Sequence, residues 1–162
     1  MSISQILQPN SLKVYAGGIN VANQLVTKVT KTLALGVSTP IISVTNLSAA
    51  NPTASFRIEY CISMVNAAGT VAQSKVGIMD AAAVCTAAGV RTNSTGVATD
   101  GLYVSSNADA NIATTVQTDL SVAGVVTYSL TVASTTLAAP SVANVGMQLQ
   151  ACYNTGANLV FV

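Results

Sequence analysis

Hydrophobic and polar residues alternate most regularly at positions 55–65 of the chain. Side chains alternate across a β-strand, so this pattern predicts a half-buried strand with one face in a core. We expect the rest of the chain to supply strands that cover that face. The apolar positions are Phe56, Ile58, Tyr60, Ile62 and Met64, and the positions between them are Arg57, Glu59, Cys61 and Ser63.

Further stretches rich in β-branched residues recur at intervals of roughly 8–12 residues, a spacing typical of sandwiches and barrels. Turn signals separate them, among them a predicted hairpin loop at Asn66-Ala67-Ala68-Gly69. The predicted strands are 12–15, 24–35, 41–47, 71–79, 102–105, 112–118, 124–133, 145–153 and 159–162.

This pattern predicts an all-β fold, a single antiparallel β-sandwich. A jelly-roll-like topology is preferred over an immunoglobulin-like one, because the chain has no Trp for the Cys…Trp…Cys signature of immunoglobulin domains. Residues 1–11, with the turn signal Pro9-Asn10, are predicted to form an N-terminal arm, and residues 12–162 the sandwich domain.

One short helix is expected at residues 80–89. Asp80 suits the N-cap, the alanines that follow favour a helix, and Gly89 suits the position after its end. Residues 91–101, rich in Asn, Ser, Gly and Asp, are interpreted as a long loop.

Charge is scarce in this chain. Charged residues make up 7% of it, against about 25% in typical soluble domains, and mean hydropathy is +0.57. We therefore expect copies of the chain or partner proteins to cover much of its surface, the alternative being a monomer with a Thr/Ser/Asn surface. The net charge of +1 predicts neither nucleic acid nor an anionic membrane as partner.

A membrane span at residues 120–139 is rejected although the window is apolar. It is rich in Ser, Thr and β-branched residues, and Val126, Tyr128, Leu130 and Val132 alternate with smaller or polar residues as in a strand. The first residues lack the basic and continuous apolar regions of a secretion signal, so we expect folding in a reducing cytosol if Met1 is the native start.

Enzymatic function is not expected, and no residue is assigned a catalytic, cofactor-binding or metal-binding role. Without histidine, a Ser-His-Asp triad and a His-metal site are excluded. Glu59 is the only glutamate, and we interpret it as part of a solvated strand face. Asn107, Asp109 and Asn111 resemble the opening of a calcium loop but lack its following Gly and final Glu.

The three cysteines, Cys61, Cys85 and Cys152, form no metal-binding spacing. Buried free thiols are expected, with a Cys61–Cys152 bridge as the alternative. Two glycosylation sequons, at Asn46 and Asn93, are attributed to chance.

In composition, strand pattern, arm-like N-terminus and lack of catalytic residues, the whole chain resembles small β-sandwich virion proteins. These are the capsid decoration, cement and minor capsid proteins of tailed phages and large DNA viruses. The resemblance implies a homo-oligomer, with a trimer preferred, that binds other capsid proteins in a virion assembled in the host cytoplasm. It implies no nucleic-acid, membrane or small-molecule partner.

Such a subunit stabilises an assembled shell because it binds that state and not the dissociated one. Residues 1–20 are the first candidate for a contact arm, and residues 145–162 for an inter-subunit strand or sandwich edge. The alternative function is a secreted or surface-displayed adhesin, pilin-like or receptor-binding β-sandwich module with an extracellular location. A carbohydrate-binding role is less favoured because aromatic residues are scarce.

Overall fold

The computed structural model describes residues 29–87, 91–105, 112–134, 137, 141–154 and 156–162. They form nine strands and no helix. The strands are β1 (Val29–Ala34), β2 (Thr39–Thr45), β3 (Thr53–Val65), β4 (Ala72–Cys85), β5 (Arg91–Ser105), β6 (Ile112–Asp119), β7 (Val126–Ser134), β8 (Val142–Asn154) and β9 (Asn158–Phe161).

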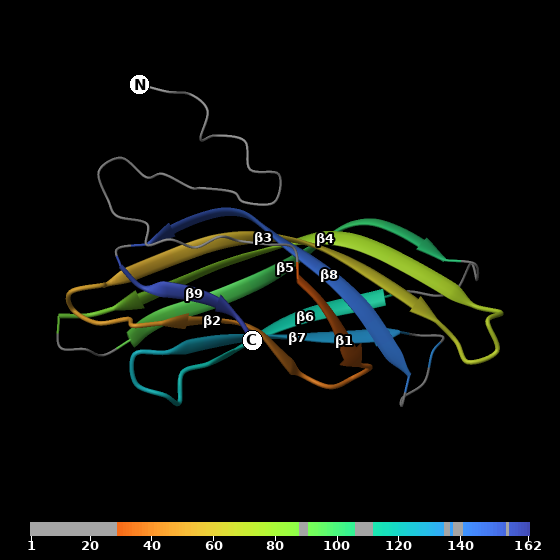
Figure 1. The fold of residues 1–162 in the computed structure, drawn as a ribbon, viewed down its shortest axis with the longest axis horizontal. Coiled ribbons are helices and arrows are strands. Elements are labelled where there is room, and N and C mark those ends of the chain that lie inside the picture. The colour runs from red at the N-terminus through yellow and green to blue at the C-terminus, as the bar shows by residue number, and fades with distance from the viewer. Residues whose placement is uncertain (1–28, 88–90, 106–111, 135–136, 138–140, 155) are drawn as a thin grey trace, which may run out of the picture.

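The strands are arranged in two antiparallel sheets that face one another (Figure 1). A five-stranded sheet has the order β1-β8-β3-β4-β5, and a four-stranded sheet has the order β6-β7-β2-β9. The prediction of an all-β antiparallel sandwich is therefore confirmed. The jelly-roll prediction is not confirmed: β1 pairs with β8 and β2 with β7, but β3, β4 and β5 follow one another as a meander.

Strand β3 lies at the centre of the five-stranded sheet, between β8 and β4. Its alternation predicted its burial correctly, since the five apolar side chains from Phe56 to Met64 are each at most 5% exposed. The intervening side chains from Arg57 to Ser63 face solvent. The central strand that the sequence predicted is thus confirmed with the correct face inward.

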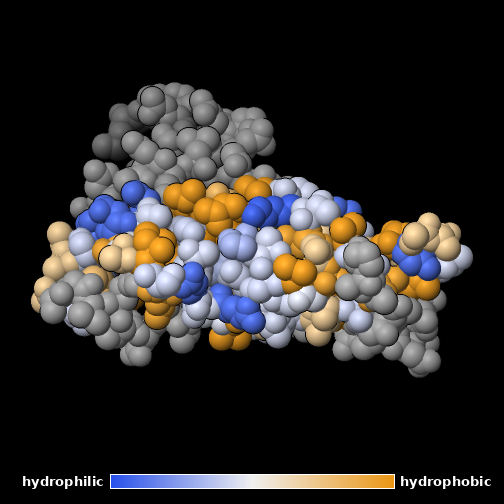
Figure 2. Space-filling model, turned by 90° about the horizontal axis from the view of Figure 1, so that it is seen from below, coloured by the Kyte–Doolittle hydropathy of each residue, from blue (hydrophilic) through white to orange (hydrophobic). Residues whose placement is uncertain are grey.

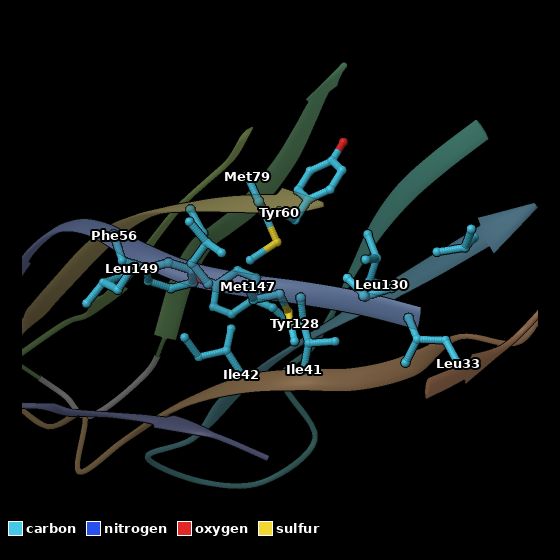
Figure 3. Packing of buried hydrophobic residues seen from close by; sticks show 14 of the residues in the cluster. Leu33, Ile41, Ile42, Phe56, Tyr60, Met79, Tyr128, Leu130, Met147 and Leu149 are labelled. Atoms are coloured by element: carbon cyan, nitrogen blue, oxygen red, sulfur yellow. The ribbon is translucent and has the colours of Figure 1, made fainter. Parts of the chain in front are cut away.

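Side chains from both sheets fill the space between them (Figure 3). The ring of Phe56 meets the ring of Tyr128 edge to face, with 5.2 Å between centroids and an interplanar angle of 87°. The buried Tyr128 hydroxyl donates a hydrogen bond to the Ala82 carbonyl at 2.9 Å. This contact satisfies a polar atom that burial would otherwise leave without a partner.

The predicted helix at residues 80–89 is wrong. Strand β4 continues to Cys85, and its burial alternates: Ala81 and Ala83 are buried whereas Asp80 and Ala82 are exposed. Alanine favours a helix only weakly, and here β3 and β5 each form a ladder with the segment. Residues 88–90, which include Gly89, lie outside the described residues.

The loop predicted at residues 91–101 is also wrong, because β5 runs through it without interruption. The small and polar residues that suggested a loop lie in the strand. A Cβ on Gly96 would stand 2.7 Å from a methyl of Val116. Glycine inside a strand marks such close approaches as well as turns.

The hairpin predicted at residues 66–69 is confirmed. Asn66 Oδ1 accepts hydrogen bonds from the backbone N–H groups of Thr70 at 2.8 Å and Val71 at 3.0 Å. Gly69 has a φ of +69°, the left-handed region that favours glycine. The Asn66 side chain therefore stabilises the tip of the β3–β4 hairpin in addition to the backbone hydrogen bonds there.

The N-terminal arm at residues 1–11, the strand predicted at 12–15 and the contact arm at 1–20 lie outside the described residues, so the division at residue 12 stays a prediction. Strand β7 occupies much of the apolar window at 120–139, with Tyr128 and Leu130 facing the core. Nowhere in the described part of the chain is there an apolar helix of membrane-spanning length.

Candidate interaction surfaces

The side chains that the sequence raised as possible chemistry lie apart from one another. Glu59 is on the solvent-facing side of β3, where its Oε2 accepts a hydrogen bond from Gln150 Nε2 at 2.6 Å. The described residues contain no group of three His, Cys, Asp or Glu side chains that could hold a metal ion. The segment from Asn107 to Asn111 lies outside them.

The alternative of a Cys61–Cys152 bridge within one chain is wrong. In the β3–β8 ladder Cys152 lies opposite Phe56, while Cys61 lies opposite Gly146. Five residues of strand place the two about 17 Å apart, and a disulfide needs Cα atoms within about 7 Å. Cys85 is buried as expected, but Cys61 is exposed, which corrects the expectation of burial for that thiol.

We call the solvent-facing side of the five-stranded sheet the outer face. Its charged part is a bidentate pair across β3 and β4: Arg57 Nε donates to Asp80 Oδ1 at 2.7 Å and Nη2 donates to Oδ2 at 2.9 Å. These hydrogen bonds, assisted by the guanidinium charge, lower the pKa of Asp80. Both side chains are half exposed, so the pair contributes little to stability.

The other end of the outer face is apolar. Ala34 pairs with Val142 across β1 and β8, and Val65 pairs with Ala72 across β3 and β4. The β3–β8 ladder ends at Ser63 opposite Asn144, and Val65 and Val142 are the next outward residues on the two strands. The four residues Ala34, Val142, Val65 and Ala72 thus form one row, which we call the apolar ridge. Val65 is 54% exposed and Val142 is 48% exposed.

A shallow depression of about 370 Å³ lies on the same face, beside the ridge. Cys61 and Gly146, opposite one another on β3 and β8, line it. Each is four residues from a ridge valine on its own strand, so the centre of the depression is about 13 Å from the ridge. The row between them consists of Thr32, Asn144, Ser63 and Ser74, of which Thr32 Oγ1 donates to Asn144 Oδ1 at 3.0 Å.

The solvent-facing side of the four-stranded sheet, which we call the neutral face, consists mainly of Ser, Thr and Ala. Thr127, Ser129 and Thr131 follow one another on β7 and are partly exposed, and Ser43 of β2, 7% exposed, shares a hydrogen bond with Thr127 at 3.0 Å. In these four strands Asp119 is the only charged residue, at the end of β6. Figure 2 views the molecule from this side, and pale colours of intermediate hydropathy fill the middle of the face.

A polar cluster between the sheets was missed by sequence reasoning. Gln73 and Lys75 of β4 are each 2% exposed. Lys75 Nζ donates to the Ile112 carbonyl, and Gln73 Oε1 accepts from Ser134 Oγ at 2.8 Å. Both residues are an even number of positions from the buried Met79 on β4, so their side chains point to the same side of the sheet. That alternation was the signal that could have identified them. It was overlooked because Gln and Lys are mostly exposed in proteins.

Comparison with known proteins identifies no family. No model of a known protein family matches the chain, and no curated protein matches it in sequence. A tailspike protein of Acinetobacter baumannii phage AM24 aligns structurally with 85% of this chain, at 12% sequence identity and a TM-score of 0.42. The aligned region is 28% of the tailspike chain. A likeness at this level establishes neither a family nor an activity.

Proposed function

We propose that this chain is a structural subunit of a virus particle, a capsid decoration, cement or minor capsid protein without enzymatic activity. The observation that supports this proposal best is the neutral face. Four adjacent strands present mainly Ser, Thr and Ala to the outside, together with Gln117 and Val160, and contain one charged residue. Surfaces that stay in water usually carry mixed charges. A weakly charged sheet face is suited to contact with another protein.

The proposed mechanism is stabilisation by mass action. A subunit that contacts neighbouring shell proteins binds the assembled state and has no site on the dissociated one, so it favours assembly. Short polar side chains held on a regular sheet lose little conformational entropy when they are covered, which lowers the cost of such a contact. No cofactor, metal or bound small molecule is required.

The test is whether the chain is part of a particle in its native source. We expect it to co-sediment with particles through a density gradient and to be present in a fixed copy number by quantitative mass spectrometry. Gradient-purified particles that lack the chain would contradict the proposal. Recovery from a cell surface instead would favour the adhesin-like alternative.

A variant tests the neutral face itself. Thr115→Lys places a charge at an exposed position of β6 on this face, and we expect it to lower occupancy on the particle at least tenfold. Thr99→Lys is the matched control, because Thr99 is also exposed but lies on β5 in the other sheet. Equal occupancy of the two variants would show that the neutral face is not the contact surface.

A further inference from the structure

We propose that the outer face binds a second copy of this chain about a two-fold axis, with the apolar ridge of each copy in the depression of the other. The proposal deepens the proposed function, and rests on it for the premise that the weakly charged surface is covered. It names the first partner, which is the chain itself, and the face that binds it.

The geometry of such a pair follows from the sheet register. The two-fold axis would run across the strands, along the row between the ridge and the depression. Rotation about it places each strand antiparallel to the same strand of the second copy. Each ridge residue then faces the residue on that strand that lies four positions away in sequence. Val65 then faces Cys61, and Val142 faces Gly146. The arrangement is isologous, because the same patch supplies both halves of the contact.

Side-chain sizes along the two rows are complementary. The two valines in the centre of the ridge face two small residues of the depression, Cys61 and Gly146. At the two sides the relation is reversed, since ridge Ala72 faces the larger Val76, and ridge Ala34 faces Thr30. Large side chains therefore meet small ones at all four positions, which is the condition for close packing of two sheet faces.

Charge also permits this pairing. The ridge, the row between, and the row of Thr30, Gly146, Cys61 and Val76 contain no charged residue, and on the axis Ser63 and Asn144 meet their own copies. Glu59 also lines the depression, one row farther from the axis, and accepts a hydrogen bond from Gln150. Arg57 and Asp80 lie beyond the depression row and pair with each other. Two copies can thus approach without bringing like charges together, which would oppose association.

The area sets the strength of the contact. Three rows across four strands cover about 400 Å² of sheet, roughly half of what each partner buries in a standard stable interface. We therefore expect a dimer that forms and dissociates with concentration in solution. In a particle, further contacts of each subunit would reinforce it.

The decisive experiment uses the native thiol of Cys61. In Val65→Cys, mild oxidation should join the new thiol to Cys61 of the second copy and give a covalent dimer on a non-reducing gel. The double variant Val65→Cys with Cys61→Ser should give no covalent dimer. The unmodified chain should give none either, because the Cys61 residues of the two copies would be about 13 Å apart along the strand. Val65 is 54% exposed, so the substitution leaves the core intact.

Sedimentation velocity of the unmodified chain from micromolar to millimolar concentration should show monomer and dimer in exchange. Val142→Lys should raise the dissociation constant at least tenfold. Val160→Lys, on β9 of the other sheet, is the matched control, because Val160 is 44% exposed and Val142 is 48% exposed. The control should leave the constant unchanged.

A monomer at every concentration, a trimer, an open chain of subunits or an unaffected Val142→Lys would each overturn the inference. The proposed function fails separately. A chain that is monomeric alone but present in particles refutes only the two-fold pair. A chain that dimerises as described but occurs in no particle refutes only the virion assignment.

Discussion

Single glycines set how closely strands and side chains approach one another in this sandwich. Gly77 is directly opposite Tyr60 in the β3–β4 ladder, and the phenol ring of Tyr60 lies over it. A Cβ at position 77 would stand 2.3 Å from the Tyr60 hydroxyl oxygen and 2.6 Å from the Thr99 carbonyl oxygen. An aromatic ring that covers a strand glycine is a known way of stabilising that position.

Gly77→Ala should therefore destabilise the protein, by about 2–3 kcal/mol, the upper range for overpacking a core. The cost is high because one of the obstructing atoms belongs to the backbone and cannot rotate away. Urea unfolding followed by circular dichroism measures the change. Ser74→Ala, on the exposed side of the same strand, should change the free energy of unfolding by less than about 0.5 kcal/mol. Equal stability of the two variants would contradict this account.

At the scale of the element, β4 shows how ladder pairing overrides local propensity. Residues 80–85 have an N-capping residue and an alanine run, which favour a helix when read alone. Strand β4 nevertheless pairs with β3 over all but its last residue, from Ala72 opposite Val65 to Val84 opposite Thr53. Those contacts bury Met79, Ala81 and Ala83 in the core, and a solvent-exposed helix could not replace that burial.

Adjacent alanines of β4 should respond very differently to the same substitution. Ala83→Asn places an amide at a position that is 0% exposed and should cost about 3 kcal/mol or more, from burial of a polar group and overpacking. Ala82→Asn, on the exposed side, should cost less than about 1 kcal/mol. Thermal unfolding of both variants checks the difference. Similar effects at both positions would mean that the segment is not an alternating strand.

At the scale of the whole molecule, the charged residues of the strands lie almost entirely in one of the two sheets. Strands of the five-stranded sheet contain Lys31, Arg57, Glu59, Lys75, Asp80, Arg91 and Asp100, whereas strands of the four-stranded sheet contain Asp119 alone. Even within the five-stranded sheet, the apolar ridge and the rows beside it are uncharged. Both surfaces that we assign to contacts therefore exclude ionic interactions from their centres.

Self-association through the outer face should be nearly independent of salt. We expect the dissociation constant of the pair to change less than about twofold between 50 and 500 mM NaCl, because salt screens charges and the three facing rows contain none. Glu59 lines only the side of the depression that is farthest from the axis. Sedimentation velocity at the two salt concentrations measures it. A manyfold weakening at high salt would indicate an interface built on ion pairs and would exclude the ridge.

Part of the candidate surface could be predicted from the sequence. The alternation in β3 identified Glu59 and Ser63 as outward residues, and their neighbours on β4 followed from the confirmed hairpin, whereas the Cys61 thiol between them was expected to be buried. The ridge could not be predicted, because Val142 comes from β8 and Ala34 from β1, far from Val65 along the chain. Residues 145–162 were expected to form an inter-subunit strand or a sandwich edge. The edge expectation is wrong for β8, which has a paired neighbour on each side, and right for β9, which is at an edge of the four-stranded sheet.

The sequence by itself determined which residues face the core where apolar and polar residues alternate clearly, as in β3, because alternation along a strand is a local property that survives in any antiparallel arrangement. It also determined the chemistry of the surface, since scarcity of charge is fixed by composition. Tertiary structure alone decided the partners of each strand, the conversion of residues 80–85 and 91–101 into strand, and the meeting of four distant residues in one ridge. The physical reason is that pairing energies depend on neighbours remote in sequence, which no local pattern contains.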